Sequence, residues 1–219
     1  LFLVRDAVFR RIAARTGEAR AFDTIEDDDS RVIIAGFGRF GQIIGRVLSL
    51  KRIRFTALDT SAAQVDFVRR FGNRIYYGDP SRVDLLRAAR ADKAEVMVLA
   101  VDDLAASMKT LETVKHHFPH LKVVARARNR QHAYALIGAG VELVIRETFH
   151  GSLEAARLTL EELGLPSGDA REVVWQFAEY DEEQVRRAAP LRDDFEALLA
   201  SAREYTAELE RLFDADARS

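Results

Sequence analysis

The sequence predicts an α/β fold built on a parallel sheet, and three features carry that prediction. From Arg31 onward, short runs rich in β-branched residues alternate with longer stretches at helical spacing, as in parallel strands joined by crossover helices. The first short run leads directly into a glycine-rich turn. After Arg146 the strand pattern stops and only helical patterns follow. We therefore expect a doubly wound parallel six-stranded sheet with a C-terminal helical extension.

The strand candidates follow one another in regular order. They are Val32–Ala35, Phe55–Leu58, Ile75–Tyr77, Val96–Val101, Val123–Ala125 and Val141–Ile145. Helical stretches between them include 64–71, 84–89 and 104–118. With right-handed crossovers, these elements form a complete Rossmann sheet.

Three further helices are expected after the last strand. The first covers 152–163 and is ended by Gly164, the second follows Asp169, and the third begins after Pro190. The third carries an apolar stripe several turns long. An apolar helix face is stable only when buried, so this helix must pack on the sheet domain, on a second copy or on another protein.

The first 30 residues lie outside this pattern. Apolar residues recur there at helical spacing among arginines, and an acidic run covers 26–29. The apolar residues are Leu1, Val4, Val8 and Ile12. Two interpretations stay open, a solvated helix with a linker, and a juxtamembrane segment whose arginines face the cytoplasm.

These patterns divide the chain into three predicted parts. They are an N-terminal helix and linker over 1–30, the sheet domain over 31–147, and the helical extension over 148–219. The chain begins at Leu1 rather than Met, which is compatible with a piece of a longer protein.

Composition excludes several classes of protein. Of 219 residues, 48% are hydrophobic, so a packed core is expected. The net charge is −2 with both signs interspersed, which argues against a nucleic-acid partner. There is no cysteine, so disulfides, thiolate metal sites and a cysteine nucleophile are excluded, and a reducing cytosolic setting fits.

The glycine-rich turn predicts an adenine-nucleotide site. The segment Gly36-Phe37-Gly38-Arg39-Phe40-Gly41 has the spacing GxGxxG between a strand and a helix, where glycines permit a tight turn and close approach of a phosphate. Asp59 comes at the end of the next apolar run, where an acid accepts from a ribose hydroxyl, and Thr60 follows it. Because Asp59 repels a 2′-phosphate, AMP, ATP or NAD(H) is preferred over NADP.

Acids after the next two strands are candidates for the same pocket. Asp79 follows the third strand and Asp102-Asp103 the fourth, at the carboxyl edge where doubly wound sheets bind ligands. The alternative is helix capping, because each precedes a helical run.

Arginines gather at strand ends in the second half and suggest a second anionic ligand. Arg126, Arg128 and Arg130 come after the fifth strand, Arg146 after the sixth, and Arg46 on the helix that follows the glycine turn. Guanidinium groups suit carboxylates and phosphates, although a solvated surface role is the alternative for each.

Catalysis finds little support in the sequence. The five histidines form no metal-ligand pattern, and His116, His117 and His120 close a helix, where cations suit the dipole. No GxSxG elbow is present, and after the sixth strand only helices follow, so no substrate domain stands beside the nucleotide. The pattern indicates a sensor rather than an enzyme, with no metal site.

Five segments in order resemble a known family. They are Arg31 to Gln42 (RVIIAGFGRFGQ), Tyr76 to Asp79 (YYGD), His117 to Leu121 (HFPHL), Ala125 to Arg128 (ARAR) and Arg146 to Phe149 (RETF). Together they resemble the cytosolic regulatory domain, of the RCK or KTN (TrkA-N-like) family, of glutathione-gated Kef potassium efflux systems. The resemblance runs from about Arg31 to Leu165 and weakens beyond.

The resemblance implies a function and partners. Such a domain hangs by a linker below a potassium:proton antiporter module, in the same full-length chain, at the cytoplasmic face of the bacterial inner membrane. It forms a homodimer, binds AMP or NAD(H) at the glycine turn, and binds glutathione or its adducts, which gate transport. Some members have a flavodoxin-like quinone oxidoreductase subunit.

Carried over by position, the glutathione-contacting arginines fall on Arg46 and Arg146. An asparagine of the family, on the helix after the RETF segment, falls on Asp181, and this is a departure. A carboxylate loses the amide's donor and repels an acidic tripeptide. Two alternatives to the antiporter regulator stay open, a small NAD-dependent oxidoreductase and a Trk-type peripheral regulator of potassium uptake.

Overall fold

The computed structural model describes residues 29–70 and 75–216. They form two compact units, one ending at Ala125 and the other beginning at Arg126. The predicted N-terminal helix and most of the predicted linker fall on 1–28 and lie outside the described residues. Within the described ranges, no helix has both the length and the apolar character needed to cross a membrane.

The predicted parallel sheet is confirmed. Its strands are β1 (Val32–Ala35), β2 (Phe55–Asp59), β3 (Ile75–Tyr77), β4 (Val96–Leu99), β5 (Lys122–Ala127) and β6 (Leu143–Arg146). Their order in the sheet is β3-β2-β1-β4-β5-β6, the doubly wound order in which the chain reverses direction beside β1. In register, Ala35 at the end of β1 pairs with Leu58 on one side and Leu99 on the other. The loops after β1, β2 and β4 therefore leave the sheet at one edge.

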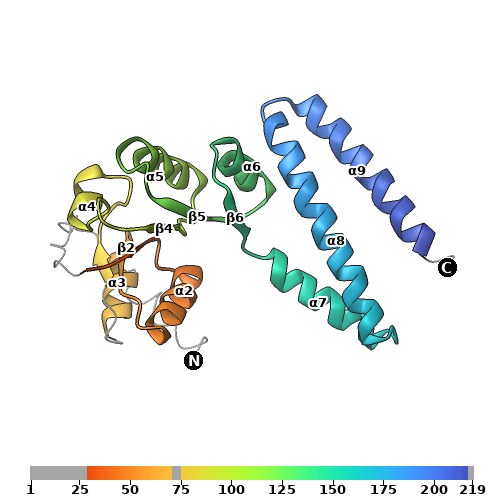
Figure 1. The fold of residues 1–219 in the computed structure, drawn as a ribbon, viewed down its shortest axis with the longest axis horizontal. Helices are drawn as coiled ribbons and strands as arrows, with labels where there is room; N and C mark the ends of the chain where they lie inside the picture. The colour runs from red at the N-terminus through yellow and green to blue at the C-terminus, as the bar shows by residue number, and fades with distance from the viewer. Residues whose placement is uncertain (1–28, 71–74, 217–219) are drawn as a thin grey trace. The chain divides into compact units, whose positions relative to one another are not determined.

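Four helices belong to the first unit. They are α2 (Arg39–Leu50), α3 (Ala62–Arg69), α4 (Val83–Ala88) and α5 (Leu104–His117). Figure 1 shows α2 and α3 on one face of the sheet and α4 and α5 on the other, as right-handed crossovers on both sides of β1 require.

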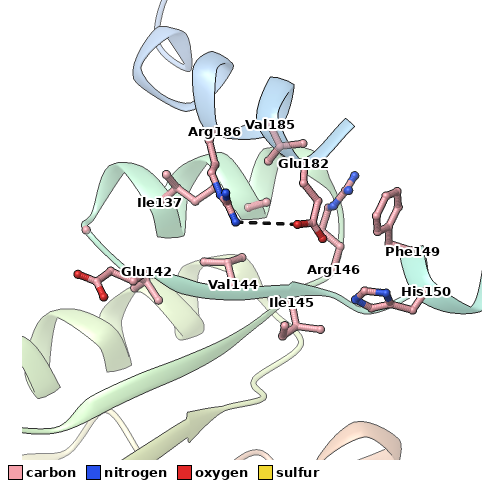
Figure 2. A pocket seen from close by; sticks show the side chains of 13 residues that line it. Ile137, Glu142, Val144, Ile145, Arg146, Phe149, His150, Glu182, Val185 and Arg186 are labelled. Carbon is pink, nitrogen blue, oxygen red and sulfur yellow. Dashed lines mark ion pairs between the residues drawn. The ribbon is translucent and has the colours of Figure 1, made fainter. Parts of the chain in front are cut away.

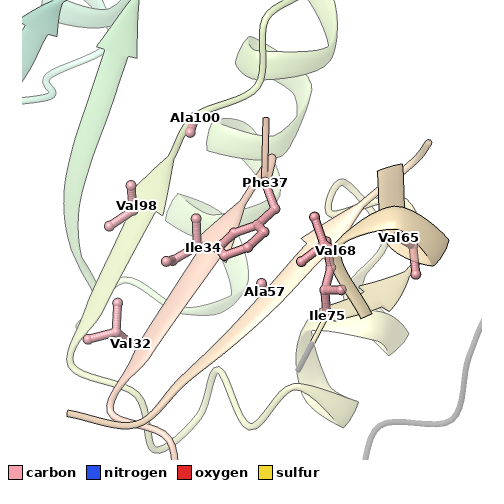
Figure 3. Close-up of a cluster of buried hydrophobic side chains, with 9 residues drawn as sticks. All are labelled: Val32, Ile34, Phe37, Ala57, Val65, Val68, Ile75, Val98 and Ala100. Atoms are coloured by element: carbon pink, nitrogen blue, oxygen red, sulfur yellow. The ribbon is translucent and has the colours of Figure 1, made fainter. Parts of the chain in front are cut away.

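A buried apolar cluster fixes the face beneath α2 and α3. Ile34 and Ala57, from β1 and β2, are fully buried, and Val65 and Val68 of α3 pack with them. Figure 3 shows the ring of Phe37 among these side chains, although Phe37 belongs to the glycine turn and not to a strand. The turn is therefore anchored in the core.

The second unit is mainly helical. After the end of β5 it contains α6 (Arg130–Gly138), β6, α7 (Phe149–Glu162), α8 (Ser167–Ala188), a short 3₁₀ helix η1 (Ala189–Leu191) and α9 (Phe195–Asp216). Figure 1 shows α8 and α9 as two long helices that run beside each other in opposite directions after η1. The third predicted helix thus packs on the second helix of its own chain, which leaves its other faces exposed.

Some element boundaries differ from the predicted ones. Arg126 lies inside β5 rather than after it, and Arg146 is the last residue of β6 rather than its successor. Asp181 lies on α8, the second helix after the RETF segment and not the first. The end of β5 was predicted too early because the strand continues past its apolar residues through Arg126. Hydrogen-bonded pairing, and not apolar character, decides where a strand stops.

Candidate nucleotide-binding turn and arginine cluster

The first glycine of the turn has no possible substitute. Gly36 has φ of +90°, and a Cβ on it would lie 2.7 Å from the backbone carbon and oxygen of Ala100. Its amide donates to the carbonyl of Leu58, at 2.8 Å, so the turn begins tied to β2. Only glycine meets both the left-handed backbone and the close approach of the β4 end.

The other two glycines play different parts. A Cβ on Gly41 would lie 2.3 Å from the carbonyl oxygen of Gly36, so this glycine allows α2 to start close against the turn. A Cβ on Gly38 would meet nothing within 4 Å. Gly38 is also the N-cap of α2 and supplies no side-chain cap to the helix. The turn thus leaves open space before the amides of a helix N-terminus, which is the arrangement that receives a phosphate.

Asp59 holds the turn in shape. One carboxylate oxygen accepts from the amide of Phe37, at 2.7 Å, and the other from the amide of Ser61, at 2.8 Å. Burial raises the pKa of Asp59 above its ordinary value, and the two amides partly oppose this because they stabilise the charged form. Each oxygen keeps a lone pair that a ribose hydroxyl can use.

Two glutamine side chains, from different helices, donate hydrogen bonds to the carbonyl of Phe37, and neither was predicted from the sequence. The side-chain amide of Gln42, on α2, donates to it at 3.2 Å, and that of Gln64, on α3, at 3.1 Å. The ring of Phe37 is 2% exposed and stacks on Phe55 with centroids 5.8 Å apart. Gln42 directly follows the glycine motif, so its contact with the turn could have been predicted from the sequence. Gln64 reaches the turn only through the fold.

The remaining predicted nucleotide residues lie at the same edge or beside it. Arg39 is exposed at the start of α2, Phe40 packs against the core cluster, and Thr60 is exposed after β2. Asp79, after β3, accepts from the amide of Ser81 at 2.9 Å, and Asp102 is exposed after β4. Their contact with a nucleotide stays a prediction.

Asp103, the residue after Asp102, has the helix-capping role that was the alternative to nucleotide binding. Asp103 is the N-cap of α5, and its carboxylate accepts from the amide of Ala106 at 2.9 Å. Asp79 instead stabilises the turn that precedes α4, whose N-cap is Arg82.

The predicted anion-binding arginines are distributed over both units. Arg46 lies in the first unit, on the outer face of α2, where Ile43, Val47 and Leu50 are 62%, 56% and 84% exposed. Arg126, in the second unit, is buried and donates through Nε to Glu147 at 2.9 Å. Arg128 is exposed. Arg126 is therefore engaged within the protein, and the ligand role predicted for it, as for Arg128, stays a prediction.

A separate cluster of charged side chains, also in the second unit, surrounds Asp181, which is 1% exposed. Arg146 Nη1 lies 2.5 Å from Asp181 Oδ2, while Arg130 and the hydroxyl of Tyr205 both donate to Oδ1, the latter at 2.8 Å. Burial lowers the pKa of Arg146, and the neighbouring Arg130 lowers it further. The cluster joins α6, the end of β6, α8 and α9, and no simple periodicity predicts it.

A pocket of about 460 Å³ lies beside this cluster. Its walls come from α6, the loop after it, β6, the start of α7, and α8. They combine apolar side chains with the polar residues Glu142, Arg146, His150, Glu182 and Arg186. In Figure 2 the guanidinium of Arg146 lies beside the ring of Phe149, at 3.5 Å from its centroid. Arg146 Nη2 is buried without a hydrogen-bond partner among the described residues. A buried donor of this kind favours an acceptor from outside.

Comparison with known proteins is consistent with this geometry. The family model of the TrkA-N domain matches residues 32–147, more than half of the chain. The chain belongs to the TrkA-N domain family. The model of the potassium efflux system KefB C-terminal domain matches residues 151–219. The resemblance to a Kef-type regulatory domain is thereby confirmed.

Individual relatives agree with the TrkA-N assignment. The glutathione-regulated potassium-efflux system protein KefC of Escherichia coli O157:H7 (strain EC4115 / EHEC) is 43% identical over 201 residues, which are 92% of this chain and 32% of the relative. The chain thus spans about a third of that protein's length. A solved structure, the Shewanella denitrificans Kef CTD in AMP bound form, is 39% identical with a TM-score of 0.67 and covers 73% of this chain and 98% of its own.

A more distant TrkA-N structure supports the fold alone. It is the TrkA-N domain of the inner membrane protein ybaL from Escherichia coli, at 23% identity and a TM-score of 0.53, covering 63% of this chain and 99% of its own. The TrkA-N match in the present chain contains the glycine turn, Asp59 and Arg146, whereas Asp181 and Tyr205 lie in the KefB C-terminal match.

Proposed function

We propose that this chain is the ligand-sensing regulatory domain of a Kef-type potassium:proton efflux antiporter. In this proposal an adenine nucleotide occupies the glycine turn as a signalling or structural ligand, and the domain performs no catalysis. The observation that carries it is the open space before Gly38, at a helix N-terminus, in a turn that Asp59 holds from the neighbouring strand.

AMP is the first candidate for the nucleotide and NAD(H) the second. A relative 39% identical is described in its AMP-bound form. The phosphate would lie before the amides of Gly38 and Arg39, and the ribose would donate to Asp59. Asp79 and Asp102 would lie at the rim of the same pocket.

Glutathione, or an adduct of it, is the proposed second ligand. The pocket beside Arg146 supports it, because a buried guanidinium nitrogen without a partner suits a carboxylate while Phe149, Ile145 and Val185 suit an apolar substituent. The glutathione contact that the family resemblance implies for Arg46 stays a prediction. Each ligand would gate transport only by its difference in affinity between the closed and open states.

The proposed assembly is a homodimer at the cytoplasmic face of the bacterial inner membrane. The antiporter module would belong to the same full-length chain, in keeping with the longer relatives, and a flavodoxin-like quinone oxidoreductase would be an ancillary subunit. The exposed apolar residues of α2 support an interface between copies.

Thermal denaturation of the purified chain with AMP, NADH, glutathione or a bulky S-conjugate of glutathione tests the proposal. We expect AMP to raise the melting temperature by several degrees at saturating concentration, and glutathione or its conjugate to add a further rise. A Gly38→Ala variant should lose only the AMP response, and Arg146→Gln only the glutathione response. If none of the four compounds raises the melting temperature, the sensor proposal is wrong.

The same samples distinguish the two alternatives. Turnover of NADH with an added electron acceptor would favour the oxidoreductase. A mass near that of a dimer in light scattering favours the Kef-type regulator, whereas a larger ring would favour the peripheral Trk-type regulator.

A further inference from the structure

Asp181 is a buried carboxylate whose two oxygens both face cations of its own chain. Oδ2 lies against Arg146, and Oδ1 accepts from Arg130 and from the hydroxyl of Tyr205. Its side chain is 2% exposed, whereas that of Arg130 is 43% exposed. A carboxylate buried to this extent keeps its charge only when it is paired and hydrogen-bonded, so this arrangement is part of the folded unit.

The pairing uses part of the anion-binding capacity of Arg146. A free guanidinium offers a carboxylate two parallel N–H donors, but Nη1 of Arg146 already forms an ion pair with Asp181 Oδ2 at 2.5 Å. Among the described residues, neither Nη2 of Arg146 nor Oδ2 of Asp181 has a hydrogen-bond partner, so charge rather than a hydrogen bond holds the pair. Asp181 and the two arginines together leave one net positive charge. An asparagine at the same place would leave two and would release Nη1.

The other charges at this place do not replace Asp181. Glu182, the next residue of α8, lines the pocket and lies 3.9 Å from Arg186. Burial and Arg130 lower the pKa of Arg146, and Glu182 only partly opposes them. Glu147 is engaged with Arg126. Asp181 is thus the carboxylate that contacts Arg146 directly among the described residues.

We propose that Asp181 is a built-in counter-ion that competes with the second ligand for Arg146 and so determines the affinity of that site. The proposal rests on the proposed function, in which a carboxylate-bearing ligand binds at Arg146. An entering carboxylate either takes Nη2 alone or displaces Asp181, and displacement leaves a buried carboxylate short of a partner. In both cases the site binds the ligand's carboxylate more weakly than Arg130 and Arg146 would bind it without Asp181.

Calorimetric titration with glutathione tests the competition in the full chain. Asp181→Asn, which keeps the shape and an acceptor for Tyr205, should bind glutathione about tenfold more tightly than the unmodified chain, because one opposing charge is removed. Glu183→Gln is the matched control, since it removes a carboxylate of the same helix that pairs with Arg187 at the surface and does not line the pocket, and its affinity should change by less than about threefold. AMP binding, measured on each variant, should stay unchanged and reports that the protein is folded.

Further variants separate the possible failures. Tyr205→Phe keeps the carboxylate and should give no gain in affinity, and Asp181→Ser replaces Asp181→Asn if the latter does not fold. If the unmodified chain binds glutathione through Arg146 but neutralising Asp181 does not tighten binding, the counter-ion proposal is overturned alone. If no variant binds glutathione, both this proposal and the second-ligand proposal are overturned.

Discussion

The carboxylate of Asp59 accepts a hydrogen bond from the amide of Phe37, 22 residues earlier in the chain, at 2.7 Å. Phe37 follows β1 and Asp59 is the last residue of β2, and the ends of these two neighbouring parallel strands lie at one edge because Ala35 pairs with Leu58. The acid predicted to bind the ribose therefore also fixes the turn that would receive the phosphate. A substitution at Asp59 should disturb both parts of a bound nucleotide.

The glycines of the turn should separate stability from binding. Gly38→Ala places a methyl group in open space, so we expect a change of less than about 1 kcal/mol in the free energy of unfolding. AMP affinity should nevertheless fall at least about tenfold, because the methyl group would occupy the position of the phosphate. Gly36→Ala should instead destabilise the domain by roughly 2 kcal/mol or more, since its Cβ meets the backbone of Ala100 at φ of +90°.

Urea denaturation and AMP titration of the two variants check this contrast. Retention of full AMP affinity by Gly38→Ala would argue against a phosphate at the turn. An equal loss of stability in both variants would contradict the open space at Gly38.

The raised pKa of Asp59 predicts a pH dependence with a definite sign. Because its pKa is higher in the folded domain than the ordinary value of 3.8, the folded state takes up a proton more readily than the unfolded chain. The contribution of Asp59 to the free energy of unfolding should thus be largest below about pH 3.8 and decrease as the pH rises through the folded pKa. A ribose hydroxyl binds the charged form, so the stabilisation by AMP should increase with pH over the same window.

Melting temperatures with and without AMP, measured from pH 4 upward (about one unit per step), test this linkage. In Asp59→Asn, the AMP-induced rise in melting temperature should no longer increase with pH in the acidic range. If the AMP-induced rise in melting temperature changes with pH in the same way in Asp59→Asn, the pH dependence arises from the nucleotide and not from Asp59.

The pair between Arg126 and Glu147 should be structural. Their side chains are 9% and 21% exposed, so Arg126→Ala leaves a mostly buried carboxylate unpaired and should cost about 3 kcal/mol in the free energy of unfolding. Arg31→Ala breaks the exposed pair with Glu95 and should not change the denaturation midpoint measurably. A loss of glutathione affinity in Arg126→Ala without a loss of stability would instead give Arg126 the ligand role.

The hydroxyl of Tyr205 should hold α9 against α8. It donates to buried Asp181, and its ring stacks on Tyr180 with centroids 5.3 Å apart. Tyr205→Phe removes one donor from a buried carboxylate and should cost about 1–3 kcal/mol, with faster amide exchange along α9. Tyr180→Phe, whose hydroxyl donates to the less buried Glu208, should cost less. Equal exchange rates in α9 of both variants would place the attachment of this helix elsewhere.

The sequence predicted the nucleotide turn because its chemistry is local. Gly36, Gly38 and Gly41 lie within six consecutive residues, and Asp59 follows the next apolar run at the expected distance. Gln64 was missed because a glutamine on an amphipathic helix carries no signal of its own. Its role exists only because the crossover to α3 returns the chain beside the turn.

The charged cluster in the second unit could be predicted only in part. Arg146 was predicted from its place at a strand end and again through the family resemblance, whereas Asp181 was predicted through the resemblance alone and was expected to repel an acidic ligand. The structure pairs it with two arginines and Tyr205, and this pairing is the ground for proposing that Asp181 competes with the ligand for Arg146.

The sequence by itself determined the order of strands and helices, the glycine turn and the family, because periodicity and short motifs depend on neighbours along the chain. The tertiary structure decided which charges are engaged with one another. Asp181 and Tyr205 meet across two helices, and Arg146 reaches Asp181 from the end of a strand 35 residues earlier. Whether a carboxylate opposes a ligand by charge or by occupying its arginine depends on distances of a few ångströms, which only folding brings about.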